Sequence, residues 1–246
     1  MTQEEFHRRT QMLVGEEAMQ RLIAARVIVF GVGGVGSWCV ESLVRSGIVR
    51  VTIVDSDCVS PTNVNRQLMA TVPNEGRPKV EALRERLLDI NPEAQITAIQ
   101  GVYDETTASQ YDLNGYDYVV DAIDTVKAKI LLIQNATASS AKLFSSMGAA
   151  LKMDPARIEV SEFWKVNGCP LARALRNVLK RPGMRPRKKF LCVWSPELLP
   201  NLGDTAMLES EAGAIKQKAN GTVAHITAIF GFTLAGLIVK DITILK

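Results

Sequence analysis

Cysteine is scarce in this sequence, and its spacing excludes one common class of metal site. The chain has 4 cysteines, and no two of them form a Cys-x-x-Cys pair. A zinc site of four thiolates built from two such pairs is therefore excluded, and we expect no zinc. We interpret Cys39, Cys58 and Cys192 as buried packing residues with free thiols, as in a reducing cytoplasm.

The sequence also lacks an apolar leader, because its N-terminus is polar and charged. Charge is absent from a different stretch, residues 221–239, whose length approaches the roughly 20 residues of a membrane-spanning helix. That stretch is interrupted by Gly231, Gly236 and polar side chains such as His225. We therefore predict a buried core or dimer-interface segment rather than a membrane span, in a cytoplasmic protein.

Acidic residues are missing from residues 173–189, which instead hold a dense basic run. The eight cations of this basic run are Arg173, Arg176, Lys180, Arg181, Arg185, Arg187, Lys188 and Lys189. The whole chain carries a net charge of only +3, so the remainder is acidic and the cationic character is local. This pattern favours contact with an RNA backbone over a merely solvated basic face. Trp164 and Trp194 are candidates for stacking on a base, with packing as the alternative.

The remaining composition is that of an ordinary globular protein. The chain has 246 residues, of which 47% are hydrophobic and 22% charged, and this length suits a single large domain. We predict one domain over residues 1–246, with a nucleotide-binding core in 1–150. Residues 151–246 then form an elaborated extension that faces the substrate and forms the dimer.

Strand-like and helix-like segments alternate along the first half of the chain. Apolar runs predict strands at 27–30, 49–54, 96–99, 118–122, 158–163 and 191–194. Helical periodicity predicts helices at 16–25, 37–45, 79–90, 127–139 and 171–179. Alternation of this kind implies an α/β fold with a doubly wound, mostly parallel sheet and right-handed crossovers.

A glycine-rich turn joins the first predicted strand to the helix that follows it. The turn reads Gly31-Val32-Gly33-Gly34-Val35-Gly36. Glycines let the backbone pass close to a phosphate, and the helix that starts there directs its free N–H groups at the anion. Alone this motif is a weak signal, but its place between a strand and a helix predicts a nucleotide site.

Polar residues farther along the chain indicate which nucleotide is bound. Asp55 ends the second predicted strand, where a ribose-binding acid is expected. A triphosphate needs in addition cationic side chains and a carboxylate to hold magnesium. The groups that meet this need are Asp57, Asn63, Arg66, Gln67, Lys79 and Asp124.

Three of these residues are the candidates for catalysis. Arg66 can grip phosphate oxygens through its planar fork. Lys79 starts a helix, where the helix dipole disfavours a cation unless an anion is bound nearby. Asp124 follows a strand on the side where doubly wound sheets bind ligands, so it is the expected Mg²⁺ ligand, whereas we interpret Asp121 as structural. We therefore predict a protein that uses ATP.

Four of these segments also resemble a known family. GVGGVG, IVDSDCVSPTNVNRQ, GRPKVEALRERLLDINPE and VVDAIDT, in this order, resemble the ThiF/MoeB/ubiquitin-activating superfamily of adenylating enzymes. The resemblance covers about residues 10–165 and implies ATP–Mg roles for Gly33, Asp55, Asn63, Arg66, Lys79 and Asp124. It also implies a homodimer in which an N-terminal arginine, here Arg8 or Arg9, reaches the partner's ATP site.

The second half of the chain is similar to one branch of this superfamily. SSMGAALKMDPARIEVSEFWKV, CPLARALR and FLCVWSPE resemble the tRNA threonylcarbamoyladenosine dehydratases. That resemblance implies that ATP activates the threonyl carboxylate of a modified adenosine beside the anticodon, after which the side chain cyclises. It leaves open whether a monovalent cation (Na⁺ or K⁺) is bound.

Three alternatives follow from the same residues. An enzyme that adenylates the Gly-Gly tail of a ubiquitin-like or sulfur-carrier protein uses the same ATP site. A non-catalytic nucleotide sensor or an NAD-dependent oxidoreductase needs only the glycine turn. Cys169 stands directly before the basic helix, where a thiolate would be favoured, so a nucleophilic role is a further hypothesis.

Overall fold

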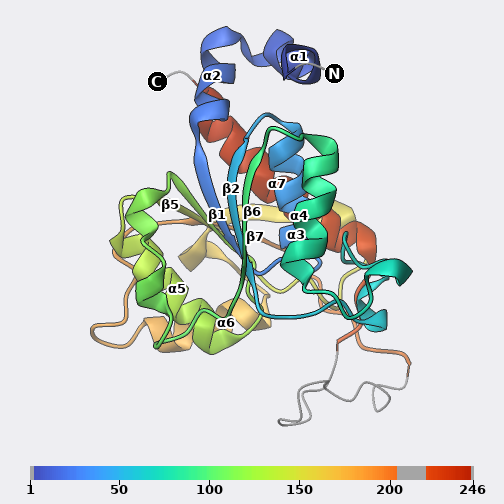
Figure 1. The fold of residues 1–246 in the computed structure, drawn as a ribbon. Helices are drawn as coiled ribbons and strands as arrows, with labels where there is room; N and C mark the ends of the chain where they lie inside the picture. The colour runs from blue at the N-terminus through green and yellow to red at the C-terminus, as the bar shows by residue number, and fades with distance from the viewer. Residues whose placement is uncertain (1–2, 204–219, 245–246) are drawn as a thin grey trace.

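A seven-stranded sheet runs through the computed structural model, which describes residues 3–203 and 220–244 (Figure 1). Its strands are β1 (Arg26–Phe30), β2 (Arg50–Asp55), β3 (Gln95–Gln100), β4 (Tyr118–Asp121), β5 (Lys142–Ser146), β6 (Glu159–Glu162) and β7 (Leu191–Trp194). The order is β3-β2-β1-β4-β5-β7-β6, and every neighbouring pair is parallel except β6 with β7. The predicted doubly wound, mostly parallel α/β fold is confirmed.

Helices cover both faces of this sheet (Figure 1). They are α1 (Gln3–Val14), α2 (Glu16–Ala24), α3 (Gly36–Arg45), α4 (Lys79–Ile90), α5 (Val126–Ala138), α6 (Pro170–Leu179) and α7 (Ala224–Thr243). Short 3-10 helices are η1 (Pro61–Asn63), η2 (Val72–Asn74), η3 (Ala108–Gln110), η4 (Leu113–Gly115), η5 (Pro155–Arg157) and η6 (Phe163–Lys165). Helices α3, α4 and α7 lie on one face, and α5 and α6 lie on the other.

Alternate residues of the central strands face the two helical layers. On β1, Val27 and Val29 join the cluster made with α2, α3, α4 and α7, whereas Ile28 and Phe30 join the cluster made with α5 and α6. All four side chains are buried, because β1 lies in the middle of the sheet. Burial on both faces explains why the strand reads as a continuous apolar run.

The uncharged stretch 221–239 forms most of helix α7. Among the described residues, α7 is long and apolar enough to cross a membrane, but its apolar side chains pack against α2, α3, β5 and β7. A Cβ added at Gly231 would lie 2.5 Å from the Val35 carbonyl oxygen, so α7 crosses the start of α3 without room for a side chain. The prediction of a buried core segment is confirmed in part, because α7 packs in the core, whereas a role at a dimer interface stays a prediction.

The strands and helices predicted by residue range agree with the observed ones within one residue at either end, but the prediction omits α1 and β5 and does not assign α7 as a helix. Strand β5 ends in two buried serines, and Ser145 is satisfied by donating to Asp121 Oδ2 at 2.7 Å. A hydrogen bond between residues 24 positions apart leaves no periodic pattern in the sequence, so periodicity could not predict β5. The burial of Cys58 was predicted wrongly: its side chain is exposed, because residue 58 makes only an isolated bridge with Pro78 after β2 has ended.

Candidate functional site

The glycine turn follows β1 at the carboxyl edge of the sheet, and two of its glycines are required by the fold. Gly31 has φ +84°, and a Cβ there would lie 2.7 Å from the Ala122 carbonyl oxygen. A Cβ at Gly36 would lie 1.8 Å from the Gly31 carbonyl oxygen. These two positions therefore let α3 start directly against the ends of β1 and β4.

Gly33 and Gly34 occupy different surroundings. A Cβ at Gly34 would meet the Thr227 side chain at 3.2 Å and Arg66 Cγ at 3.3 Å. A Cβ at Gly33 would meet only Gln67 Nε2, at 3.7 Å, which is an ordinary contact. Protein packing therefore does not demand a glycine at 33, and the open space above it is available to a ligand.

Asp55 at the end of β2 holds this turn in place. Its Oδ2 accepts a hydrogen bond from the Val32 N–H at 2.8 Å, and its Oδ1 accepts one from the Asp57 N–H at 2.9 Å. Burial raises the pKa of Asp55, although nearby Lys79 and the two backbone N–H groups act in the opposite direction. Each oxygen retains capacity for a second donor, as a ribose hydroxyl would supply.

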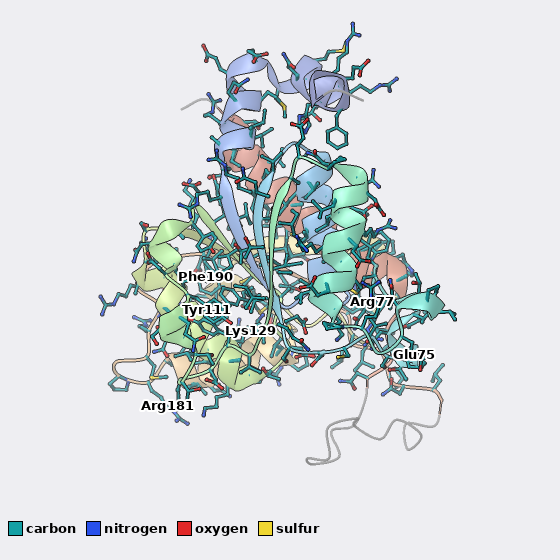
Figure 2. All side chains as sticks on the ribbon, in the orientation of Figure 1. Glu75, Arg77, Tyr111, Lys129, Arg181 and Phe190 are labelled. Carbon is teal, nitrogen blue, oxygen red and sulfur yellow. The ribbon has the colours of Figure 1, made fainter. Side chains whose placement is uncertain are left out.

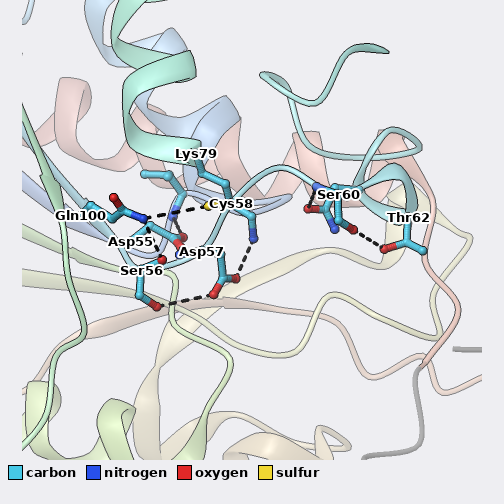
Figure 3. Close-up of polar contacts among 10 residues, drawn as sticks. Asp55, Ser56, Asp57, Cys58, Ser60, Thr62, Lys79 and Gln100 are labelled. Atoms are coloured by element: carbon cyan, nitrogen blue, oxygen red, sulfur yellow. Dashed lines mark hydrogen bonds and ion pairs between the residues drawn. The ribbon is translucent and has the colours of Figure 1, made fainter. Parts of the chain in front are cut away.

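Lys79 and Asp57 form an ion pair beside Asp55 (Figure 3). Lys79 Nζ lies 2.7 Å from Asp57 Oδ2, and the lysine side chain is 7% exposed whereas that of Asp57 is 64% exposed. Asp57 therefore already supplies an anion at the start of α4. The position of Lys79 at a helix N-terminus is thus accounted for within the protein, and a phosphate partner for Lys79 stays a prediction.

The loop after β2 presents Asn63 and Gln67. The Ser60 N–H donates to Asn63 Oδ1 at 3.2 Å and caps η1, which leaves the amide Nδ2 of Asn63 without an acceptor among the described residues. Gln67 is buried, and its Oε1 has no hydrogen-bond partner in that part of the chain. Asn63 thus offers a donor, and Gln67, whose amide lies beside Gly33, offers an acceptor.

Arg66 lies between the glycine turn and Asp124. Its Nη1 donates to the Thr62 carbonyl and to Asn65 Oδ1, both at 2.9 Å, and its Cγ lies beside Gly34. Partial burial lowers the pKa of Arg66, and the opposing influence of Asp124 shows that the two charges are neighbours. Asp124 is exposed and accepts no hydrogen bond from the described residues.

Asp121, at the end of β4, has the structural role expected for it. Its carboxylate lies 2.8 Å from Lys129 Nζ, and both side chains are completely buried. Ser145 Oγ donates to the same carboxylate, and Lys129 also donates to the Ile123 carbonyl at 2.9 Å. The pair ties β4, β5 and α5 together beneath the site.

The fold gives some cations of the basic run a contact within the protein and leaves others without one in the described part of the chain. Arg176 Nη1 donates to the Phe163 and Val166 carbonyls, Lys188 Nζ donates to the Ser139 carbonyl, and Arg185 lies over the Trp164 ring at 5.3 Å. The side chains that point outward are Arg173, Lys180, Arg181, Arg187 and Lys189. Figure 2 places Arg181 beneath α5 and α6, on the opposite side of the molecule from Arg77.

Four further candidate residues lie apart from the turn or are enclosed. Cys169 precedes α6 and is 2% exposed within the core cluster, so a reactant has no path to its thiol. Trp194 is buried, which makes it a packing residue. The exposed residues Arg8 and Arg9 lie on α1, which stands away from the sheet at the end opposite the glycine turn (Figure 1).

A metal ion in this site could be held by one carboxylate, that of Asp124, together with oxygens of a bound ligand. Within residues 3–203 and 220–244, no three His, Cys, Asp or Glu side chains come together in a way that could hold an ion. Asp124 fits Mg²⁺, because an exposed carboxylate without a hydrogen-bond donor is a suitable hard ligand and phosphate oxygens complete such sites.

Two contacts of the site were not predicted. Trp38 Nε1 donates to the Arg66 carbonyl at 3.1 Å, and Asn65 bridges Arg66 to the segment before α7. The only signal for Asn65 in the sequence is its place directly before the arginine. The Thr222 carbonyl that it contacts lies 157 residues away, so no local pattern reveals the bridge.

A mostly parallel sheet with a glycine turn, a partly buried acid and two cations at its carboxyl edge defines a nucleotide-binding protein of the doubly wound class. The chain belongs to the ThiF family, whose sequence profile matches residues 7–243.

Individual relatives agree with this assignment. The tRNA threonylcarbamoyladenosine dehydratase of Bacillus subtilis is 37% identical over 238 residues, covering 95% of this chain and 93% of that protein. The Escherichia coli enzyme of that name is 37% identical over 235 residues, covering 91% and 88%. The crystal structure of the E. coli tRNA N6-threonylcarbamoyladenosine dehydratase in complex with ATP has a TM-score of 0.85 at 33% identity and covers 97% of this chain and 94% of that one.

Proposed function

We propose that this protein is a cytoplasmic tRNA threonylcarbamoyladenosine dehydratase that uses ATP to cyclise a modified adenosine beside the anticodon. The observation that carries the proposal is the arrangement of Arg66 and Lys79 around a glycine turn with open space above Gly33. Similarity to dehydratases along nearly the whole chain supports the choice of substrate.

The chemistry begins with a carboxylate, which is a poor electrophile because it has no good leaving group. Attack of a threonyl carboxylate oxygen on the α-phosphorus of ATP forms an acyl-adenylate and releases pyrophosphate. The carbamoyl group of the same side chain then attacks the acyl carbon and displaces AMP. The proton that the carbamoyl group loses in this step passes to water. The RNA has lost one water in total, and the ring closure gains from proximity.

The residues of the site have distinct tasks in this scheme. The N–H groups at the start of α3 face the phosphates, and Asp55 accepts from the ribose. Arg66 and Lys79 bind phosphate oxygens and stabilise the charge that develops as pyrophosphate leaves. Asn63 donates to the phosphates, and Gln67 accepts from the nucleotide. Asp124 would hold Mg²⁺, which supplies further neutralisation of the phosphate charge when bound.

Part of the basic run provides the contact with tRNA in this proposal. The exposed cations Arg173, Lys180, Arg181, Arg187 and Lys189 can pair with phosphates, whereas Arg176 and Lys188 are held by backbone carbonyls. Trp164 beneath Arg185 is half-buried and offers a surface for stacking at the edge of this region.

We also propose a homodimer, supported by apolar side chains on α1. Met12 is 80% exposed and Leu13 is 86% exposed on a helix that stands away from the sheet (Figure 1). Covering these side chains with a second copy would remove them from water. Light scattering on the purified protein measures the mass; a monomer at micromolar concentration contradicts the dimer.

The proposed reaction is tested by the mass of the RNA. Purified protein, ATP and Mg²⁺ are incubated with tRNA that carries threonylcarbamoyladenosine, and the nucleosides are measured by mass spectrometry. The expected result is a product lighter by one water, with AMP and pyrophosphate released in equal amounts. Unmodified tRNA is the control and should release neither. Modified tRNA of unchanged mass contradicts the proposal.

Two further measurements separate this proposal from the alternatives. An enzyme for carrier proteins would show ATP–pyrophosphate exchange that depends on a protein ending in Gly-Gly instead of on tRNA. An NAD-dependent oxidoreductase would bind the dinucleotide tightly, and its binding would not respond to loss of the Lys79 charge.

A further inference from the structure

Asn65 uses both ends of its side-chain amide to join two distant parts of the chain. Its Oδ1 accepts from Arg66 Nη1 at 2.9 Å, and its Nδ2 donates to the Thr222 carbonyl at 2.9 Å. A guanidinium can only donate and a carbonyl can only accept, so the amide satisfies both partners in a single orientation. The side chain is exposed, so packing does not account for this bridge.

Thr222 belongs to a connecting segment, residues 220–223, that leads into α7 and is anchored elsewhere. The Leu151 N–H donates to the Gly221 carbonyl at 2.9 Å, and the Gly221 N–H donates to Asn201 Oδ1 at 2.8 Å. A few residues farther on, Thr227 of α7 packs against Gly34 of the glycine turn. The segment therefore offers Asn65 a fixed carbonyl next to the nucleotide site.

Arg66 needs such an anchor. It lies on a loop after β2 rather than on a strand or helix, and its guanidinium must hold one orientation to grip phosphate oxygens through two nitrogens. Its contact with the Thr62 carbonyl comes from the same loop and moves with it. The contact through Asn65 is the one that ties the guanidinium to a separate element.

We propose that Asn65 is a positioning residue for ATP: it fixes the Arg66 guanidinium by tying it to the connecting segment before α7. This inference rests on the proposed function, because it assumes that Arg66 binds the phosphates. Neither Asn65 nor the connecting segment touches the nucleotide in this proposal. The effect of Asn65 on ATP passes entirely through Arg66.

The chain contains a matched control for this arrangement. Asn74 Oδ1 accepts from Arg77 Nη1 at 2.9 Å, and Asn74 Nδ2 donates to the Met69 carbonyl at 3.0 Å. The bonding pattern is the same, but Arg77 pairs with Glu85 and takes no part in the proposed site. Asn65→Leu and Asn74→Leu therefore remove equivalent bonds, only one of which concerns ATP.

The test is calorimetric titration with ATP and Mg²⁺, together with melting temperatures without nucleotide. We expect Asn65→Leu to weaken ATP binding about tenfold, the order expected when a charged group loses one hydrogen bond. Asn74→Leu should lower the melting temperature by about as much as Asn65→Leu does, but it should leave the ATP affinity unchanged. Asn65→Asp keeps the acceptor for Arg66 but loses the donor to Thr222, and should weaken binding as Asn65→Leu does.

A double-mutant cycle shows whether Asn65 acts through Arg66. In an Arg66→Ala background, Asn65→Leu should cause no further loss of ATP affinity. The inference is overturned if that loss persists, if either Asn65 variant binds ATP like the wild type, or if Asn74→Leu weakens binding equally. A wild-type protein that does not bind ATP overturns the proposed function and this inference together, whereas normal wild-type binding with unaffected variants overturns this inference alone.

Discussion

The ammonium of Lys79 and the carboxylate of Asp57 lie 2.7 Å apart, with the lysine buried and the aspartate facing solvent. In the proposed function, a phosphate would approach from the exposed side and compete with Asp57 for the same cation. The pairing with Asp57 spares the folded protein an unpaired buried charge at Lys79, which would be costly.

Removing Lys79 should mainly reduce activity, whereas removing the charge of Asp57 should mainly reduce stability. Lys79→Met leaves the exposed Asp57 unpaired and removes a cation near Asp55, whose carboxylate keeps its two backbone N–H donors. We therefore expect a modest change in melting temperature but a loss of about 10²-fold in ATP turnover. Asp57→Asn leaves the buried ammonium without its carboxylate, so the melting temperature without ligand should fall further. Thermal melts with and without ATP–Mg²⁺ check this: ATP should raise the melting temperature of Asp57→Asn more than that of the wild type. Equal shifts contradict a phosphate partner for Lys79.

Two glycines of the same turn should respond differently to alanine. A Cβ at Gly36 would lie 1.8 Å from the Gly31 carbonyl oxygen, so Gly36→Ala should destabilise the fold by several kcal/mol or prevent folding. A Cβ at Gly33 meets only Gln67, so Gly33→Ala should fold normally but bind ATP at least about tenfold more weakly. Calorimetric titration and denaturant unfolding of both variants measure the contrast. Normal ATP affinity in Gly33→Ala would show that the open space above residue 33 is not used.

The exposed members of the basic run should control the salt dependence of tRNA binding. Changing Lys180, Arg181 and Lys189 to Ala should weaken binding and reduce the slope of log affinity against log salt by about 2, since each phosphate contact contributes roughly 0.7 to 0.9. Filter binding over a range of salt concentrations measures the slope. Arg50→Ala with Lys240→Ala, which removes exposed cations elsewhere, is the control. An unchanged slope in the triple variant would remove this surface from the RNA interface.

Acidification should weaken the attachment of α1. His7 is buried, its Nε2 has no hydrogen-bond partner in the described part of the chain, and burial lowers its pKa although Glu93 acts in the opposite direction. Below the ordinary histidine pKa of about 6.5, His7 takes up a proton in the unfolded chain but resists it in the folded chain. The stability of the fold therefore decreases as the pH is lowered. Hydrogen exchange of the α1 amides between pH 7.5 and 5.5 should show faster opening. His7→Phe, which packs but does not titrate, should abolish the pH dependence; an unchanged response would assign it to another group.

The order of elements, the glycine turn and the polar residues that follow β2 and β4 were determined by local sequence. Buried parallel strands need continuous apolar runs, and helices need a period near 3.6, so both leave a pattern that can be read residue by residue. The same holds for Gly31 and Gly36, because a strand that turns directly into a helix admits no side chain there.

Tertiary structure alone decided which cations are available and which are held. Arg176 and Lys188 belong to one basic run with Arg181, yet backbone carbonyls accept hydrogen bonds from the first two, whereas the Arg181 side chain makes no such bond in the described part of the chain. Asp57 neutralises Lys79 across 22 positions, and Asn65 reaches Thr222 across 157. Hydrogen bonds and ion pairs depend on distances in space that the chain acquires only on folding, and no periodicity along the sequence records them.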